Sequence, residues 1–153
     1  MEHPKAKGDR STMTIILALH EAGLAVYLPY GENTRSDLIL EDGDRIKRVQ
    51  CKTGRLRNGA VVFAACSSYA HHRNARSARR DYHGQIDFFA VYCPQTSGVY
   101  LIPIEDLNVI AKGALRVERP RNNQKRGIRS AAAYQIGRVT IGPTQEPGAP
   151  SGA

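Results

Sequence analysis

The sequence contains no tryptophan, only three cysteines and no long hydrophobic run. The cysteines are odd in number, widely spaced and without a C-x-x-C pair, which argues against a disulfide framework or a zinc knuckle. No segment approaches the ~18 consecutive apolar residues of a membrane helix, and the charged first ten residues lack the apolar core of a secretory signal. We therefore expect a cytoplasmic protein with no membrane partner.

Acidic residues are also few, because 14 Asp and Glu stand against 22 Lys and Arg, giving a net charge of +8. A basic surface attracts polyanions, and nucleic acids are the commonest of these. The positive charge is concentrated in residues 71–83, with four arginines and three histidines, and in residues 112–129, with seven Lys and Arg. Both segments are typical of irregular, hydrophilic loops that can reach a phosphate backbone.

The chain of 153 residues is long enough for one compact domain with a real core, expected over residues 9–141. Residues 1–8 are expected to be a loose tail, and residues 142–153, rich in Gly and Pro, a disordered one. Apolar residues at helical spacing predict a helix over 9–22, capped by Asp9 or Ser11 and followed by Gly23.

The remaining pattern predicts mainly strands. Residues 37–40 and 45–53 read as a hairpin with the turn Asp42-Gly43. Further strands are expected at 24–28, 60–65, 86–92 and 99–102, with a short helix over 104–110. The predicted fold class is therefore α/β, with a mixed central β-sheet flanked by helices.

The hairpin also carries the candidate chemistry. Side chains two residues apart in a strand share a face, so Gln50 and Lys52 project together, and the hairpin brings Asp37 beside them. A carboxylate and a carboxamide oxygen suit a hard cation such as Mg²⁺, and a lysine beside them can stabilise charge or help activate water. This set predicts metal-assisted hydrolysis of a phosphodiester, although the same spacing also occurs on ordinary solvated sheet faces.

The run Pro29-Tyr-Gly-Glu-Asn-Thr-Arg-Ser-Asp37-Leu-Ile, followed by Arg48-Val-Gln-Cys-Lys-Thr-Gly54, resembles the pattern P-x-G-E-N-x-R-Y-D-L…V-Q-x-K-T-G. That pattern belongs to PD-(D/E)xK endonucleases similar to group I intron-encoded homing endonucleases, in which Gln replaces the usual acid. The resemblance continues through residues 86–92, 99–103 and 121–129, and spans residues 7–138. It implies a restriction-endonuclease-like core and a DNA endonuclease that uses Mg²⁺ or Mn²⁺.

The resemblance also implies roles for individual residues. Asp37 and Gln50 match the metal-ligand positions, Lys52 matches the active-site lysine, and the main-chain carbonyl of Cys51 matches a further ligand. Thr12 stands where the family has a helical Glu, and Asp9, three residues earlier, is the candidate replacement for the missing acid.

Basic residues near these elements and in the two basic segments are the expected DNA contacts. They are Arg35, Arg55, Arg57, Arg73, Arg76, Arg79, Arg80, Arg121, Lys125, Arg126 and Arg129. Since one active site cuts one strand, double-strand cleavage favours a homo-oligomer, a dimer or higher.

Three functions stay open at this point. The first is a metal-dependent DNA endonuclease. The second is a catalytically impaired DNA-binding module on the same fold, motivated by Thr12. The third is an RNA-processing or interaction protein in which the Gln-x-Lys run is accidental. A zinc site at Cys66, His71, His72 and His83 is less favoured than a basic loop, because no second spaced pair supports it.

Overall fold

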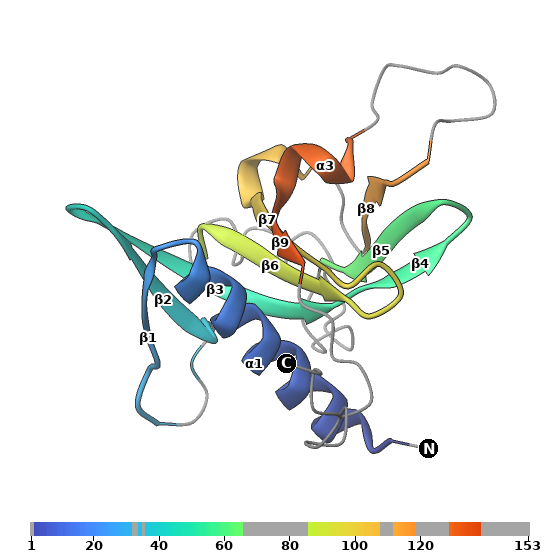
Figure 1. Cartoon of the computed structure of the whole chain (residues 1–153). Helices are drawn as coiled ribbons and strands as arrows, with labels where there is room; N and C mark the ends of the chain where they lie inside the picture. Colours follow the sequence, from blue (N-terminus) through green and yellow to red (C-terminus); the bar gives the residue numbers. More distant parts are fainter. Residues whose placement is uncertain are drawn as a thin grey trace, which may run out of the picture.

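The computed structural model describes residues 2–31, 34, 36–65, 86–107, 112–118 and 129–138. A long helix crosses one face of a six-stranded mixed sheet, and a three-stranded sheet packs on the other face (Figure 1). The helices are α1 (Pro4–Glu21), the 3-10 helix η1 (Ile104–Asp106) and α3 (Ala131–Tyr134). The strands are β1 (Ala25–Tyr27), β2 (Leu38–Asp42), β3 (Arg45–Thr53), β4 (Arg55–Arg57), β5 (Ala60–Ala64), β6 (Phe88–Cys93), β7 (Gly98–Pro103), β8 (Lys112–Arg116) and β9 (Gln135–Arg138).

Helix α1 starts earlier than its apolar pattern indicates. It begins at Pro4, with His3 as the N-cap, so the expected loose tail is wrong for residues 4–8. Proline suits the first helical turn, where its missing N–H costs nothing. The C-terminal end is confirmed: Gly23 has φ +85° and donates its N–H to the carbonyl of His20, and Leu24 donates to Leu19.

The six-stranded sheet has the order β1-β2-β3-β6-β7-β9. β3 and β6 pair in parallel, and the other neighbours are antiparallel, so the expected mixed sheet is confirmed. The β2–β3 hairpin is confirmed too, but Asp42 pairs with Arg45, and the two turn residues are Gly43 and Asp44. Gly43 has φ +62°, which a glycine adopts without strain.

Asp87 fixes the register of the parallel pair. Its N–H donates to the carbonyl of Arg48, and its Oδ2 accepts from the N–H of Arg48 at 2.8 Å, with Arg48 Nε at 3.4 Å. Partial burial raises the pKa of this carboxyl, but the hydrogen bonds and charge of Arg48 outweigh that effect and lower it. β3 is therefore anchored to β6 just before the segment that carries Gln50 and Lys52.

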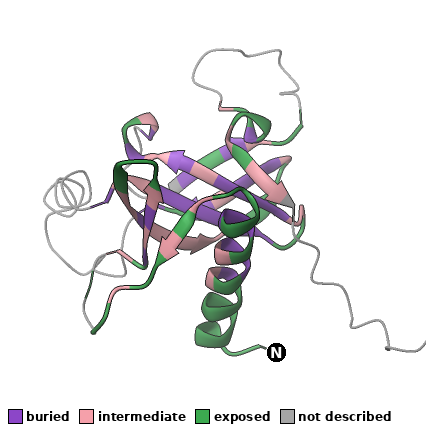
Figure 2. Ribbon diagram, turned by 60° about the vertical axis from the view of Figure 1, so that its left-hand side comes forward, coloured by how far each residue is buried: buried purple, intermediate pink, exposed green. Residues whose placement is uncertain are grey.

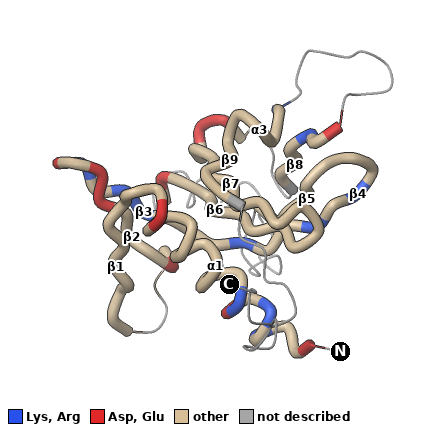
Figure 3. The backbone as a smooth tube through the Cα atoms, viewed as in Figure 1, with Lys and Arg blue, Asp and Glu red and all other residues tan. Residues whose placement is uncertain are grey.

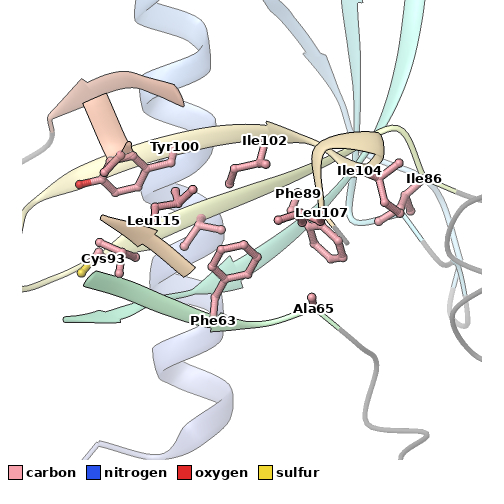
Figure 4. Close-up of a cluster of buried hydrophobic side chains, with 13 residues drawn as sticks. Phe63, Ala65, Ile86, Phe89, Cys93, Tyr100, Ile102, Ile104, Leu107 and Leu115 are labelled. Carbon is pink, nitrogen blue, oxygen red and sulfur yellow. The ribbon is translucent and has the colours of Figure 1, made fainter. Parts of the chain in front are cut away.

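Two apolar clusters lie on the two faces of the large sheet. One joins Ile15, Ala18 and Leu19 of α1 to Leu38 and Val49 of the sheet. The other fills the space between the two sheets, and Figure 4 shows its side chains from β5, β6, β7 and β8 pointing toward one another. The face on which flanking helices were expected is thus covered mainly by the sheet β4-β5-β8.

Several elements differ from the sequence-based expectation. β8 lies at the start of residues 112–129, which were expected to be irregular throughout. Its charge hides the strand pattern. Among residues 113–116, whose burial is described, Gly113 and Leu115 are buried, the glycine against the ring of Phe63. Of the helix expected over 104–110, the described part is the single turn η1, and residues 108–110 lie outside the described residues. The elements β4, α3 and β9 were not predicted. Within the described ranges, no helix combines the length and hydrophobicity that a membrane span needs.

Gly54, between β3 and β4, tests the packing between the sheets. A Cβ at this position would lie 2.7 Å from Val61 Cγ1 and 2.9 Å from Val91 Cγ1, and both side chains are buried. We expect Gly54→Ala to destabilise the protein by about 1–3 kcal/mol, the usual range for overpacking. Urea denaturation measures this change.

The matched control is Gly137→Ala, because a Cβ there meets only Ala18 at 3.6 Å, an ordinary contact. It should change the stability by less than about 1 kcal/mol. Equal effects of the two substitutions would contradict the packing assigned to Gly54.

Candidate active site

The site begins where the pairing between β2 and β3 ends. Leu38 is the first residue of β2 and pairs with Val49. Asp37, directly before it, donates its N–H to the carbonyl of Val49, at 2.8 Å. Its Oδ2 accepts the N–H of Cys51, also at 2.8 Å. A carboxylate therefore replaces the next backbone partner along this edge of β3.

The backbone of Cys51 faces this same edge. The N–H and C=O of one strand residue point toward the same neighbouring strand, and the N–H of Cys51 points toward Asp37. The carbonyl of Cys51 therefore opens on the side of Asp37, where the ladder of β2 has ended. This orientation suits the role of main-chain metal ligand that the family resemblance implies for the carbonyl of Cys51.

Gln50 and Lys52 share a face of β3, as their spacing predicts. Their partners in β6 are Phe89 and Val91, which belong to the cluster between the two sheets, so both side chains leave β3 on the side away from α1. Gln50 Oε1 is buried, and it accepts no hydrogen bond from the residues that the structure describes. A buried oxygen without a donor is uncommon and suits an ion or water as its partner.

A cavity of about 310 Å³ lies between α1 and this edge of β3. It is lined by Lys5, Gly8, Asp9, Ser11 and Thr12 of α1, by Asp37, and by Cys51, Lys52 and Thr53 of β3. The structure thus brings Asp37, Cys51, Lys52 and Asp9 around one space. Gln50 is not part of the cavity wall, and its Oε1 lies on the other face of the same strand segment.

Position 12 opens onto the same cavity. The hydroxyl of Thr12 donates to the carbonyl of Gly8 at 3.1 Å and also hydrogen-bonds with the thiol of Cys51. Asp9 lies one turn earlier on the same side of α1, and it lines the cavity together with Asp37. A side chain at position 12 therefore meets the same space as Asp37.

The donors around this edge suit a hard divalent cation. They are the carboxylate of Asp37, the unpartnered Oε1 of Gln50 and the carbonyl of Cys51, all oxygen atoms. Mg²⁺ takes oxygen ligands and is commonly held by one or two carboxylates with several waters. In the described part of the chain, no three His, Cys, Asp or Glu side chains gather as a metal cluster, so a soft transition-metal site receives no support there.

The predicted DNA contacts are only partly within the described residues. Arg55 and Arg57 are exposed on β4. Arg129 is half-buried, and its guanidinium hydrogen-bonds with the hydroxyl of Tyr134. The others lie outside the described residues: Arg35, Arg73, Arg76, Arg79, Arg80, Arg121, Lys125 and Arg126. Cys66, the three histidines of the zinc alternative and the predicted tail 142–153 lie outside them as well.

Sequence reasoning missed Lys5 and Gly8, which line the cavity. Their spacing from Thr12, seven and four residues, places all three on one side of a helix. That signal was not used, because the helix was expected to begin only at Asp9.

The family model described as PD-(D/E)XK endonuclease matches residues 2–137. Among solved structures, a bacterial homing endonuclease superposes with a TM-score of 0.63 at 19% identity, covering 89% of this chain and 88% of the other. The Holliday junction resolvase Hjc of Archaeoglobus fulgidus gives a TM-score of 0.46 at 15% identity, with 72% and 92% covered. A search of curated proteins gave no significant match. The likeness to the homing endonuclease confirms the restriction-endonuclease-like fold.

The environment of Cys51 gives a prediction for its reactivity. Burial, together with the charge of Asp37, raises the pKa of this thiol to about 12, although the hydroxyl of Thr12 opposes the shift. At pH 8 only about one molecule in 10,000 then carries the reactive thiolate. We expect iodoacetamide to leave Cys51 unmodified in the native protein and to modify it in urea, as measured by peptide mass spectrometry. Rapid native labelling would contradict the packing of α1 on β3.

Proposed function

The chain belongs to the PD-(D/E)XK endonuclease family, and on this basis we propose that it hydrolyses phosphodiester bonds of DNA with a divalent cation at Asp37, Gln50 and Lys52. One observation carries the proposal. The carboxylate of Asp37 occupies the edge of β3 beyond the end of β2, held by the N–H of Cys51, while Gln50 on the same segment keeps a buried oxygen without a donor among the described residues.

Each residue has a role in this proposal. The carboxylate of Asp37, Oε1 of Gln50 and the carbonyl of Cys51 would hold Mg²⁺ or Mn²⁺. The bound ion supplies Lewis-acid stabilisation and lowers the pKa of a coordinated water. The ammonium of Lys52 stabilises negative charge on the phosphate during hydrolysis and helps to orient the attacking water.

Asp9 is the proposed second acid of the site. With Thr12 at the helical position, Asp37 would be the single formal negative charge beside the cation. Asp9 lines the same cavity one turn from Thr12, which supports a role in which its carboxylate supplies the missing charge, directly or through a coordinated water.

DNA is the substrate that the composition favours. The net charge of +8 suits a polyanion, and the homing endonuclease with the same fold is a nuclease. Cleavage of both strands would require two copies of the site, so we propose a homo-oligomer that acts in the cytoplasm.

Asp37→Asn tests the proposed site. An asparagine keeps an oxygen that can accept from Cys51 but removes the charge that a cation needs. We expect nicking of a supercoiled plasmid in Mg²⁺ or Mn²⁺ to fall by about 100-fold or more, since the ion contributes several kcal/mol. The melting temperature should stay near that of the wild type. Full activity of Asp37→Asn, or nicking that persists in EDTA, would refute the proposal.

A second candidate function is DNA binding without cleavage. The observation that favours it is Thr12, whose hydroxyl is occupied by Gly8 and Cys51 and brings no negative charge to the cavity. In that case the wild type would bind DNA in a salt-sensitive manner and would not nick it.

Thr12→Glu separates the two functions. A glutamate at this position extends into the cavity of about 310 Å³ and adds a carboxylate near Asp37. For an endonuclease that is slow for lack of this acid, we expect nicking to rise by about tenfold or more, which corresponds to about 1.4 kcal/mol. An inactive wild type that gains nicking with this substitution would establish the binding module.

Met13→Glu is the matched control, because Met13 is the next residue, is 64% exposed and does not line the cavity. It adds the same charge to the same helix and should leave nicking unchanged. Equal gains from Met13→Glu and Thr12→Glu would mean that the added charge acts elsewhere.

A further inference from the structure

The first two turns of α1 form no part of the core. All buried residues of the helix lie between Ser11 and Leu19, whereas residues 2–10 are exposed. Figure 2 shows these turns extending past the sheet, exposed all round. Yet three of their residues, Lys5, Gly8 and Asp9, form part of the cavity wall that faces Asp37. This segment therefore shapes the site without contributing to the core.

Gly8 is the first sign that the wall receives a ligand. It lies inside α1, where glycine destabilises a helix relative to alanine. Packing does not require it, because a Cβ at this position would meet no atom within 4 Å. Nor does backbone geometry require it, since its φ is not positive. What a glycine offers here is a bare stretch of helix surface, which lets another backbone approach closely.

Lys5 is the second sign. It lies three residues before Gly8 and seven before Thr12, and all three line the cavity. Lys7 is equally exposed on the same helix, but it does not line the cavity. Arg10 is paired with Glu2 at 2.8 Å. Of these basic residues, Lys5 is the one that faces the space between α1 and Asp37.

The charges over the molecule favour a polyanion at this wall. Glu41, Asp42 and Asp44 gather at the tip of the β2–β3 hairpin beside Arg45 and Lys47, whereas residues 2–10, which include the first turns of α1, carry Lys5, Lys7 and Arg10 against Glu2 and Asp9. Figure 3 shows the acidic tip and these turns at opposite ends of the molecule. The end where the cavity opens thus has a small excess of positive charge and the hairpin tip a small excess of negative charge, which favours the approach of a phosphate backbone at the cavity.

We propose that the wall formed by Lys5, Gly8 and Thr12 is the binding track for the sugar–phosphate backbone of the DNA strand that is cut. Lys5 contacts a phosphate next to the scissile one, and Gly8 lets the strand lie against the helix. This inference rests on the proposed function and deepens it, because it assigns the path of the strand at the same site.

The test is DNA binding in EDTA, where hydrolysis is prevented and binding is the only readout. The affinity for a short fluorescent duplex is measured as a function of salt for the wild type, Lys5→Gln and Lys7→Gln. Loss of one phosphate contact lowers the magnitude of the slope of log K against log salt by about 1. We expect this decrease for Lys5→Gln, and we expect Lys7→Gln to keep the wild-type slope.

Gly8→Leu tests the close approach. Leucine favours a helix more than glycine does, and a Cβ at this position meets no atom within 4 Å, so the melting temperature should stay the same or rise. Affinity for the duplex should nevertheless fall by about tenfold, since the side chain occupies the track. If Gly8 acted only through the stability of the helix, Gly8→Leu would keep or raise the melting temperature and would not weaken the binding of the duplex.

The outcomes separate this inference from the function on which it rests. A wild type that neither binds nor nicks DNA would overturn both. A wild type that nicks plasmid through Asp37, with Lys5→Gln and Lys7→Gln indistinguishable in slope, would overturn the track alone. Wild-type affinity of Gly8→Leu would overturn it as well.

Discussion

The arrangement of the site depends on the early end of the β2–β3 ladder. β2 accompanies β3 only as far as the pair Leu38 and Val49, so the segment from Gln50 to Thr53 keeps β6 as its strand neighbour and turns its other edge toward α1. Asp37 satisfies the first N–H of that edge with its carboxylate, and the remaining edge opens onto the cavity. If β2 continued for two more residues, backbone hydrogen bonds would replace the carboxylate, and no space for a cation or a phosphate would remain.

An open edge is useful for chemistry only when the strand that carries it is held still. On one face, Val49 packs against α1, and the hydroxyls of Ser11 and Thr53 share a hydrogen bond with an oxygen–oxygen distance of 2.6 Å. On the other face, Gly54 packs against Val61 and Val91. Asp87 fixes the register from the side of β6. The segment is thus fixed from three directions and open in the fourth.

How far the sequence predicts this structure depends on what each residue contacts. The hairpin and the shared face of Gln50 and Lys52 follow from the period of two along a strand, which needs no tertiary information. β8 could not be recognised, because a strand whose buried positions are Gly113 and Leu115 shows almost no apolar alternation. The start of α1 was missed for a related reason: its first turns contact no core, so they carry no apolar periodicity, and Lys5 and Gly8 were left out of the candidate site with them. The metal-ligand roles came from resemblance to a family, since spacing alone does not distinguish them from a solvated sheet face.

Two positions at the candidate site break rules that favour a stable fold. Gly8 within a helix costs about 0.5–1 kcal/mol relative to alanine, and the buried Oε1 of Gln50, without a donor among the described residues, costs about 1–3 kcal/mol. Against a typical stability of about 5–15 kcal/mol, these are considerable losses. Gly8 lines the cavity between α1 and β3, and Gln50 belongs to the strand segment beside it, although its side chain leaves β3 on the face away from α1. Two such departures, one on the helix wall and one on the neighbouring strand segment, are typical of a functional site, where a chain gives up some stability to bind a ligand.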